Sequence, residues 1–558
     1  KLALSRAAIP RWLPPRFPFM PPGESSSFSF LRRPGDPVPD HGKPTPKEAA
    51  RFLMQATLGA TTDDIAEVCA LGFEAWIDAQ FQIPTSIAHE EVRRHIAAGI
   101  PYQIHHAWWR QILTGRDLLR QRMAVALSEI FVISEVSINF VAWEMMEYYD
   151  DLAEMSFGNW RDLLKAVSLD PLMGHFLSHL RNRKADPALQ RYPDENYARE
   201  VMQLFSIGLW ELNEDGTRRR DEHGREIPTY DNTAITAFAR VFTGLGFGGP
   251  LADENKPGDF LNAPPDYSHP MKLWEDEHDR EEKALLRGTT LPAFADAPGR
   301  RAMDDIDDAM DNLFHHPNVG PFFGRLLIQR LVTSNPSPEY LRRVATAFAD
   351  NGRGERGDMK AVIKAILLDP EARNPAADPA TAGRLREPYL RYVRLARTFK
   401  ARSQEGSFKI NDHNTLLTIN QSLLNAPSVF NFFLPDYQPP GLLAAAGLYA
   451  PEFQIMTSCT AITSVNRYHR MIGDGFGEIA DDPGIMRLSF DEELKVADDP
   501  EALIDLLDLK MACGALSDET KEILLTAYRE MPADTSAEAR VKTIAQLISL
   551  SPDFAVFQ

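Results

Sequence analysis

The amino-acid sequence predicts a mainly α-helical protein: a large multi-helical body with a small β-hairpin ribbon and long Pro-rich loops. Three observations support this fold class. Apolar residues recur at helical spacing along most of the chain, alternating strand patterns are scarce, and prolines collect in a few stretches between helical segments. With 558 residues, of which 44% are hydrophobic, the chain is long enough to bury a large core.

The first 46 residues contain eleven prolines, each of which removes an amide donor and resists helix continuation. We therefore expect residues 1–46 to form an extended arm that adds no core. Thr45 and Pro46 then supply an N-cap and a first-turn residue for a helix. We expect two further regions, a helical core domain over residues 47–401 and a C-terminal helical region with a Pro-rich loop over residues 402–558.

Helical periodicity continues through most of the chain. The predicted helical segments after the first are 104–114, 116–132, 139–156, 160–169, 195–209, 233–243, 302–314, 319–332, 338–350, 358–368 and 386–401. The best strand candidate is 211–230, where two Gly turns interrupt a polar stretch and favour a hairpin ribbon. Segment 251–298 is rich in Pro, Asp and Gly and predicts a long ordered loop or lid, and 425–451 predicts another Pro-rich loop.

Composition excludes several classes of function. The net charge of −19 and the lack of a long basic run make nucleic acid a poor partner. The longest apolar stretch, 123–133, is interrupted by Ser128 and Glu129, so we expect no transmembrane segment. The three cysteines are far apart, which argues against a CxxC metal site and a disulfide framework. A Walker loop, a GxGxxG loop, HExxH and GxSxG are absent.

The segment PDENYAREVMQLFSIGLWELNEDGT, residues 193–217, resembles the bacterial family called domain of unknown function 1800. The family helix has the form N-E-N-Y-A-R-E-x-x-x-L-x-x-x-G, and this chain has Asp194 in place of the first Asn. The remaining positions are filled in order by Glu195, Asn196, Tyr197, Ala198, Arg199, Glu200, Leu204 and Gly208. Further blocks, among them RQRMAVALSEIFVIS, HDREEKALLRG and APSVFNFFLPDYQPPG, resemble other family blocks in the expected order.

This resemblance implies a mostly helical and usually exported bacterial protein, periplasmic or extracellular, often encoded beside a sulfatase-like partner protein. The resemblance does not indicate a chemical reaction for this protein. Many relatives have His-x-His where this chain has Ser128, Glu129 and Ile130, so a metal site built on those histidines is not expected here. The His-Asp pair of a later block is retained as His278 and Asp279.

Five residues are candidates for acid/base catalysis: Glu129, Asp150, Glu195, Arg199 and Glu200. Glu129 lies among apolar neighbours, where burial raises a carboxyl pKa unless an arginine meets it. Asp150 lies at the edge of an acidic helix face. Glu195 and Arg199 have the i, i+4 spacing of an ion pair, which leaves Glu200 as the acid or base, and a purely structural salt bridge is the alternative.

Metal ligands are sparse in the sequence. Glu211, Asn213, Asp215 and Glu222 have the spacing of a calcium loop, but three arginines at 218–220 oppose a cation, and a plain hairpin turn is the alternative. His175 and His179 are spaced to share one helix face, yet they need a third ligand such as His278. We expect no cofactor other than calcium, and no tightly bound zinc or copper.

Two functional hypotheses follow. The first is a hydrolase whose paired carboxylates act on an extracellular polymer such as a glycan. The second is a non-catalytic scaffold or binding subunit that pairs with the sulfatase-like partner protein, with the same ion pairs holding helices together. Carboxylates that converge in an open pocket favour the hydrolase, and carboxylates buried against arginines favour the scaffold or binding subunit.

Overall fold

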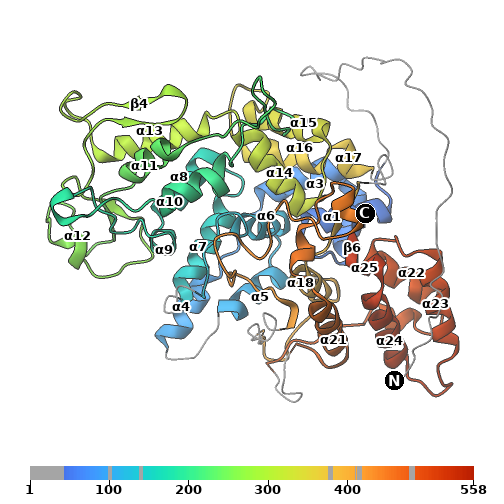
Figure 1. Ribbon diagram of the computed structural model, residues 1–558. Coiled ribbons are helices and arrows are strands. Elements are labelled where there is room, and N and C mark those ends of the chain that lie inside the picture. The colour runs from blue at the N-terminus through green and yellow to red at the C-terminus, as the bar shows by residue number, and fades with distance from the viewer. Residues whose placement is uncertain are drawn as a thin grey trace, which may run out of the picture. The chain divides into compact units, whose positions relative to one another are not determined.

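Helices make up most of the computed structural model and its strands are short, as the sequence predicts (Figure 1). The structure describes residues 43–98, 104–136, 142–374, 381–406, 408, 410, 418–476 and 484–557. Nearly all of the expected Pro-rich arm and the first residues of segment 139–156 lie outside the described residues. Residues 43–558 belong to one compact unit.

The helices of the first half begin and end as follows: α1 (Pro46–Ala56), α2 (Thr62–Leu71), α3 (Phe73–Gln82), α4 (His89–Ala97), α5 (Ile104–Thr114), α6 (Leu118–Ser128), α7 (Ala142–Met155), α8 (Trp160–Leu169), α9 (Pro171–Phe176), α10 (Asn196–Glu200) and α11 (Asn232–Val241). The later helices are α12 (Asp259–Asn262), α13 (Ala302–Phe314), α14 (Val319–Leu331), α15 (Pro338–Ala349), α16 (Met359–Leu367), α17 (Pro370–Arg373), α18 (Pro388–Thr398), α20 (Leu442–Ala445), α21 (Ser458–Asp474), α22 (Pro500–Leu507), α23 (Asp518–Arg529), α24 (Ala537–Leu550) and α25 (Pro552–Ala555).

Capping residues define many of these helix starts. Thr45 accepts a hydrogen bond from the backbone amide of Glu48, whose side chain in turn accepts from the Thr45 amide, which forms a capping box on α1. Thr61 and Asp64 repeat the arrangement on α2. The predicted segments 104–114, 160–169 and 302–314 are confirmed as α5, α8 and α13.

The predicted helix 195–209 is not regular throughout. After α10 the chain continues as a π-helix over Val201–Ser206, whose wider turn admits an extra residue. The Ser206 hydroxyl donates a hydrogen bond to the Val201 carbonyl, and Gly208 leaves the helix with φ of 72°. A Cβ at Gly208 would meet the Phe322 ring at 2.7 Å, so this position requires glycine for packing as well as for backbone conformation.

The described residues contain three two-stranded antiparallel sheets, two of which join segments that are distant in sequence. β1 (Leu245–Gly246) pairs with β2 (Lys272–Leu273), and β3 (Lys283–Ala284) pairs with β4 (Thr290–Leu291). β5 (Arg384–Leu385) pairs with β6 (Val556–Phe557), with Arg384 opposite Phe557. The last pair joins the segment before α18 to the segment after α25, so predicted regions 47–401 and 402–558 are in direct contact.

The predicted hairpin ribbon over 211–230 is confirmed as a chain of single bridges. The bridges pair Leu212 with Arg218, Arg220 with Glu226, and Trp210 with Pro228. Gly216 and Gly224 have φ of 75° and 76° at the two turns, a conformation that favours glycine.

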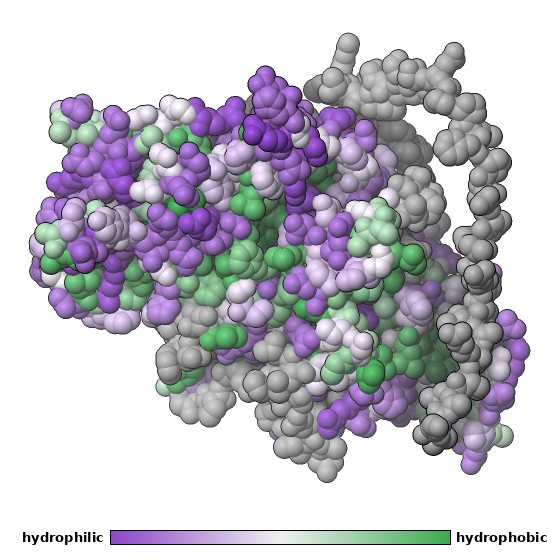
Figure 2. Space-filling model, in the orientation of Figure 1, coloured by the Kyte–Doolittle hydropathy of each residue, from purple (hydrophilic) through white to green (hydrophobic). Residues whose placement is uncertain are grey.

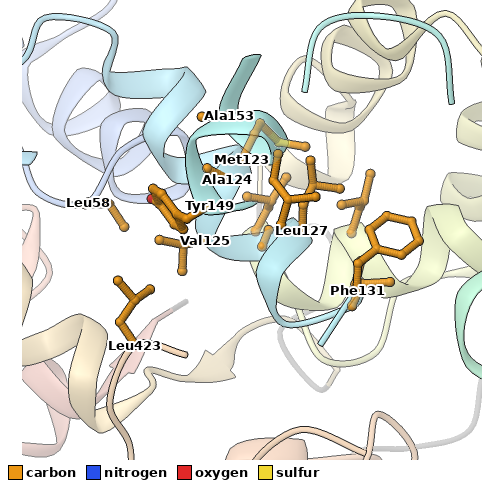
Figure 3. Packing of buried hydrophobic residues seen from close by; sticks show 14 of the residues in the cluster. Leu58, Met123, Ala124, Val125, Leu127, Phe131, Tyr149, Ala153 and Leu423 are labelled. Atoms are coloured by element: carbon orange, nitrogen blue, oxygen red, sulfur yellow. The ribbon is translucent and has the colours of Figure 1, made fainter. Parts of the chain in front are cut away.

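The hydrophobic core surrounds α6, every residue of which is buried. α7, α3, α1 and α14 all contact it. Figure 3 shows Met123 and Leu127 of this helix near Tyr149 of α7, with Phe131 just beyond the C-terminal end of α6. Phe131 also packs against the rings of Phe205 and Phe323, at centroid distances of 5.4 and 6.2 Å.

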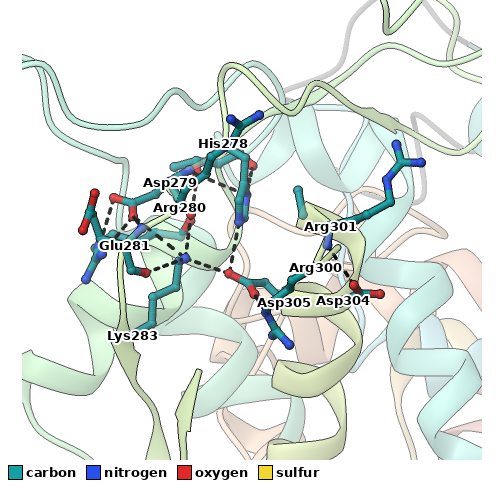
Figure 4. Close-up of polar contacts among 12 residues, drawn as sticks. His278, Asp279, Arg280, Glu281, Lys283, Arg300, Arg301, Asp304 and Asp305 are labelled. Carbon is teal, nitrogen blue, oxygen red and sulfur yellow. Dashed lines mark hydrogen bonds and ion pairs between the residues drawn. The ribbon is translucent and has the colours of Figure 1, made fainter. Parts of the chain in front are cut away.

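The long segment 251–298 is ordered and carries α12, β2, β3 and β4. A buried ionic cluster attaches it to α13 (Figure 4). The Asp305 carboxylate accepts hydrogen bonds from Lys283 Nζ at 2.7 Å, from Arg300 Nε at 2.6 Å and from His278 Nε2 at 3.2 Å. His278, Lys283 and Asp305 are completely buried, and His278 also contacts the Thr243 carbonyl through Nδ1 at 2.9 Å.

Neighbouring residues extend this cluster. Arg240 on α11 makes a bidentate pair with Asp279 at 2.8 and 2.9 Å. Burial raises the pKa of Asp305, but the hydrogen bonds from His278 and Lys283 outweigh it and hold the pKa below its usual value. The retained His278 and Asp279 therefore act as anchors of the long segment.

Cys69, Cys459 and Cys513 are free thiols. Among the described residues, no helix combines the length and the apolar character needed to cross a membrane.

Replacing Asp305 by Asn is expected to lower the free energy of unfolding by about 3–5 kcal/mol, because Lys283 and Arg300 lose a buried counter-ion. Asp304→Asn is the matched control: the neighbouring carboxylate is exposed and accepts only the Arg301 backbone amide, so its loss costs about 1 kcal/mol. Urea titrations of both variants and the wild type measure the difference. Equal midpoints for the two variants would contradict the anchoring role.

The effect of Asp305 also has a defined pH dependence. Since the folded-state pKa lies below that of an unfolded aspartate, the carboxylate stabilises the fold fully above about pH 4. This contribution is lost as pH falls below that value. The difference in the free energy of unfolding between the wild type and Asp305→Asn should therefore become smaller at acidic pH.

Candidate functional site

Glu129 lies at the C-terminal end of α6, buried as its apolar neighbours predict. Its Oε2 is 3.3 Å from Nε of Arg330 on α14, and Arg330 Nη2 donates to the Glu129 carbonyl at 2.9 Å. Arg122, two turns earlier on α6, donates to the Arg330 carbonyl. Because α6 is fully buried, its charged side chains require partners inside the protein, and residues of α14 provide them.

A second carboxylate, Glu387, lies close to Glu129 at the start of α18 and is completely buried. Gln421 bridges the two, because its Nε2 donates to Glu387 Oε2 at 2.7 Å and lies 3.4 Å from Glu129 Oε1. Arg384 Nη2 pairs with Glu387 at 2.6 Å and with Glu452 at 3.0 Å. We call Glu129, Glu387, Glu452, Arg330, Arg384 and Gln421 the buried charge cluster.

The two bridged carboxyl groups differ in acidity. Burial and the negative charge of Glu387 raise the pKa of Glu129 well above its usual value. Burial opposes ionisation of Glu387 as well, but Arg384 lowers its pKa to about 2. Burial raises the pKa of Glu452 to about 7. Of the two carboxyl groups, Glu129 is therefore the weaker acid and the one that favours the protonated form beside an ionised Glu387.

Access to this cluster is restricted. An adjoining cavity with an empty volume of about 380 Å³ is lined by Ser128, Glu129, Tyr389 and Gln421, among others. Each of the three carboxylates is less than 9% exposed. A polymer chain cannot reach them in this conformation.

Asp150 belongs to a different set of contacts. Its Oδ2 accepts from the backbone amides of Ala88 and His89 at 2.8 and 2.9 Å and contacts His89 Nδ1 at 2.9 Å. Gln111 donates to Oδ1 at 3.2 Å. The hydrogen bond to Asp150 raises the pKa of His89. Asp150 thus fixes the N-terminal end of α4 against α7.

Glu195 and Arg199 form the ion pair that their spacing predicts, at 3.3 Å, with both side chains nearly half exposed. Glu200 is buried, and burial raises its pKa. Its Oε2 and the Tyr230 hydroxyl have no hydrogen-bond partner among the described residues. Glu129, Asp150 and the Glu195 helix thus have separate partners, and the structure does not gather the five predicted residues into one cleft.

An open groove lies under the hairpin ribbon, with an empty volume of about 2080 Å³. Figure 2 shows hydrophobic residues in a hollow near the middle of the drawn face, between hydrophilic parts of the surface. The groove is lined by the π-helix, the ribbon, α14 and the Pro-rich loop, with aromatic residues Trp210, Phe322, Phe430 and Tyr449 and polar residues that include Gln203, Arg218, Arg325 and Asn335.

Comparison with family models matches residues 51–556, nearly the whole chain, to the family described as a protein of unknown function, DUF1800. The chain belongs to the DUF1800 family. The resemblance carried by segment 193–217 is confirmed. No curated protein and no solved structure matches the chain.

In this DUF1800 chain, the four residues with calcium-loop spacing have different partners. Glu211 is 3.4 Å from Arg219 and 3.7 Å from Arg287, whereas Asp215 accepts from Thr217 and lies 3.4 Å from Arg342. Asn213 donates to Thr217, and Glu222 is almost fully exposed beside His223. The described residues contain no group of three or more His, Cys, Asp or Glu side chains placed to hold a metal ion.

The three histidines considered as ligands also have separate partners. His179 is buried, stacks on Tyr197 at a centroid distance of 3.8 Å and contacts the Ser168 carbonyl. His175 lies beside Tyr267, and His278 belongs to the Asp305 cluster. The fold therefore uses these side chains for packing and anchoring.

The sequence did not identify five residues of the buried charge cluster as site residues, namely Glu387, Glu452, Arg330, Arg384 and Gln421. The one local signal was the charged run Arg384, Arg386 and Glu387 directly before a helix. That run gives no indication of the residues it meets, because Glu129, Gln421 and Glu452 come from distant segments.

Two glutamine substitutions test the assigned protonation states. Glu387→Gln should lower the free energy of unfolding by about 3–5 kcal/mol, because it leaves buried Arg384 without that counter-ion. Glu129→Gln should leave stability equal or higher at pH 7, since the amide resembles the protonated acid. Thermal unfolding of both variants at pH 7 measures the contrast.

The pH dependence provides a second readout. Because the pKa of Glu129 is raised by folding, the unfolded wild type releases its proton above about pH 4.5 while the folded form retains it, and the wild type loses stability as pH rises. Any advantage of Glu129→Gln should therefore disappear below about pH 4.5. A large loss of stability in Glu129→Gln at pH 7 would show that Glu129 is ionised.

Proposed function

We propose that the protein binds an extended polymer, such as a glycan chain, in the groove under the hairpin ribbon and does not cleave it. The separate placement of the five predicted catalytic residues supports binding over hydrolysis. A glycosidase needs two carboxyl groups on opposite sides of one bond. Here the carboxylates Glu129 and Glu387, which Gln421 bridges, are buried away from any polymer.

The side chains that line the groove support a glycan as the ligand. Aromatic faces stack on the apolar faces of sugar rings, and Trp210, Phe322, Phe430 and Tyr449 are distributed along the groove. Phe430 is 43% exposed. Amide and guanidinium groups between the rings can donate hydrogen bonds to sugar hydroxyls.

Two carboxylates of the groove, Glu226 and Asp215, are already engaged, and a third, Asp436, also lines it. Glu226 pairs with Arg218 at 2.7 Å, and Asp215 pairs with Arg342. Such paired carboxylates position the ribbon and are poorly suited to act as a general acid or base. Asn335 fixes the far wall by exchanging two hydrogen bonds with the Tyr449 backbone, at 2.8 and 2.9 Å.

Export and a sulfatase-like partner protein remain predictions from the family resemblance. Both are compatible with a binding subunit that presents a polymer to an enzyme. The hydrolase hypothesis is tested by the same variants, with Glu129 as a carboxyl group whose pKa burial raises well above its usual value.

Trp210→Ala should weaken polymer binding about tenfold, since it removes the largest aromatic face of the groove. Tyr192→Ala is the matched control, because Tyr192 is 69% exposed and lies outside the groove. Affinity electrophoresis against a panel of bacterial and plant polysaccharides identifies the ligand, and calorimetry compares the variants.

Equal affinity of Trp210→Ala and Tyr192→Ala would exclude the groove as the binding site. A reducing-end assay on the same panel tests cleavage. New reducing ends that disappear in Glu129→Gln would replace the binding proposal with hydrolysis.

A further inference from the structure

A further cavity, separate from the groove, has an empty volume of about 480 Å³ and is lined by five arginines together with several apolar side chains. We call it the arginine cavity. Its charged residues are Arg122, Arg384, Arg386, Arg391, Arg394 and Glu387. The elements around it, α1, α6, α18 and β6, lie near the middle of the ribbon in Figure 1.

The five guanidinium groups are buried in spite of their charge, with exposed fractions of 3–7%. The cavity wall contains one carboxylate, Glu387, which is already held by Arg384 and Gln421. Taking a guanidinium out of water without a counter-ion costs several kcal/mol, and like charges close together add to that cost. The cavity therefore has a large excess of positive charge.

Arg384 also pairs with Glu452, but the hydrogen bonds of Arg386, Arg391 and Arg394 go to uncharged acceptors and do not relieve the excess. Arg386 donates to the Met511 carbonyl at 3.2 Å, and Arg394 donates to the Lys510 carbonyl at 3.1 Å. Arg391 contacts the Met456 sulfur at 3.4 Å. Carbonyl and thioether acceptors carry no net charge.

Every arginine of the cavity keeps at least one buried N–H donor without a partner among the described residues. These donors are Arg122 Nη1, Arg384 Nε, Arg386 Nε, Arg391 Nε, and Arg394 Nε and Nη1. An unsatisfied buried donor is rare in native proteins, and six around one cavity indicate a missing acceptor.

We infer that the arginine cavity binds an oxyanion: phosphate, sulfate, or the phosphate or carboxylate end of a small organic molecule. A guanidinium group presents a planar fork of N–H donors that can bind two oxygens of such an acceptor at once. Met54, Leu58, Leu331, Leu390 and Phe557 form an apolar wall that could hold the rest of an organic anion. Burial and neighbouring arginines lower the pKa of Arg122 to about 10 and that of Arg386 to about 9, and a bound anion offsets the repulsion between these like charges.

Thermal unfolding tests this inference at constant ionic strength, with sodium chloride as the reference and inorganic phosphate, sulfate or phenyl phosphate as probes. A saturable rise in Tm of about 2 °C or more is expected with at least one probe. A larger rise with phenyl phosphate than with phosphate indicates an organic anion, and equal rises indicate a simple ion. No rise above the chloride reference with any probe would overturn the inference.

The variant Arg391→Met tests whether the anion-dependent rise in Tm comes from binding in the arginine cavity. Among the described residues, the hydrogen-bond acceptor of Arg391 is the Met456 sulfur, and its guanidinium also lies over the Tyr468 ring at 5.4 Å beside like-charged neighbours. Its loss should therefore leave the basal Tm about unchanged while removing most of the ion-dependent rise. Arg467→Met is the matched control: Arg467 is equally buried, has unpartnered donors and lies outside the cavity lining. This control should retain the full rise.

A full rise in Arg391→Met would place the ion elsewhere and overturn the inference. If that variant does not fold, equilibrium dialysis of the wild type against labelled phosphate decides: about one bound ion per chain at low salt supports the site, and no bound ion overturns it. These outcomes are independent of polymer binding in the groove.

Discussion

The complete burial of α6 is the constraint on which the rest of the structure depends. A helix covered on every side must find internal partners for each charge that it carries, and α6 carries Arg120 and Arg122 and is followed by Glu129. Arg120 donates to two carbonyls at the end of α7 and lies over the Phe157 ring at 4.2 Å. Arg122 and Glu129 are both held by Arg330 on α14. The positions of α7 and α14 are thus set by charges as well as by apolar packing.

The fold class and most helices could be predicted because their signals are local. Capping residues, apolar periodicity and the Gly turns of the ribbon act over a few residues, and the Glu195–Arg199 pair follows from helical spacing alone. The π-helix after α10 was missed because apolar periodicity does not distinguish it from a regular helix. Its packing against Phe322 is a tertiary effect.

The site could not be predicted to the same depth. Periodicity shows which side of a helix a carboxylate occupies but gives no information about what faces it. Glu129 contacts Arg330, which lies 201 residues further along the chain, and Gln421, which lies 292 residues further along. The arginines before and within α18 look like an ordinary basic helix in sequence, and only the packing of α1, α6 and β6 around them reveals their burial.

The pairing of β5 with β6 has a consequence for the order of folding. Phe557 and Arg384 lie opposite each other although most of the C-terminal helices separate them in sequence, and contacts between such distant segments form late. Until they form, the guanidinium groups around α18 remain in water, where they are well solvated and repel one another. The incomplete centre of a partly folded chain is then hydrophilic, which disfavours association between chains at the stage when aggregation is the main hazard.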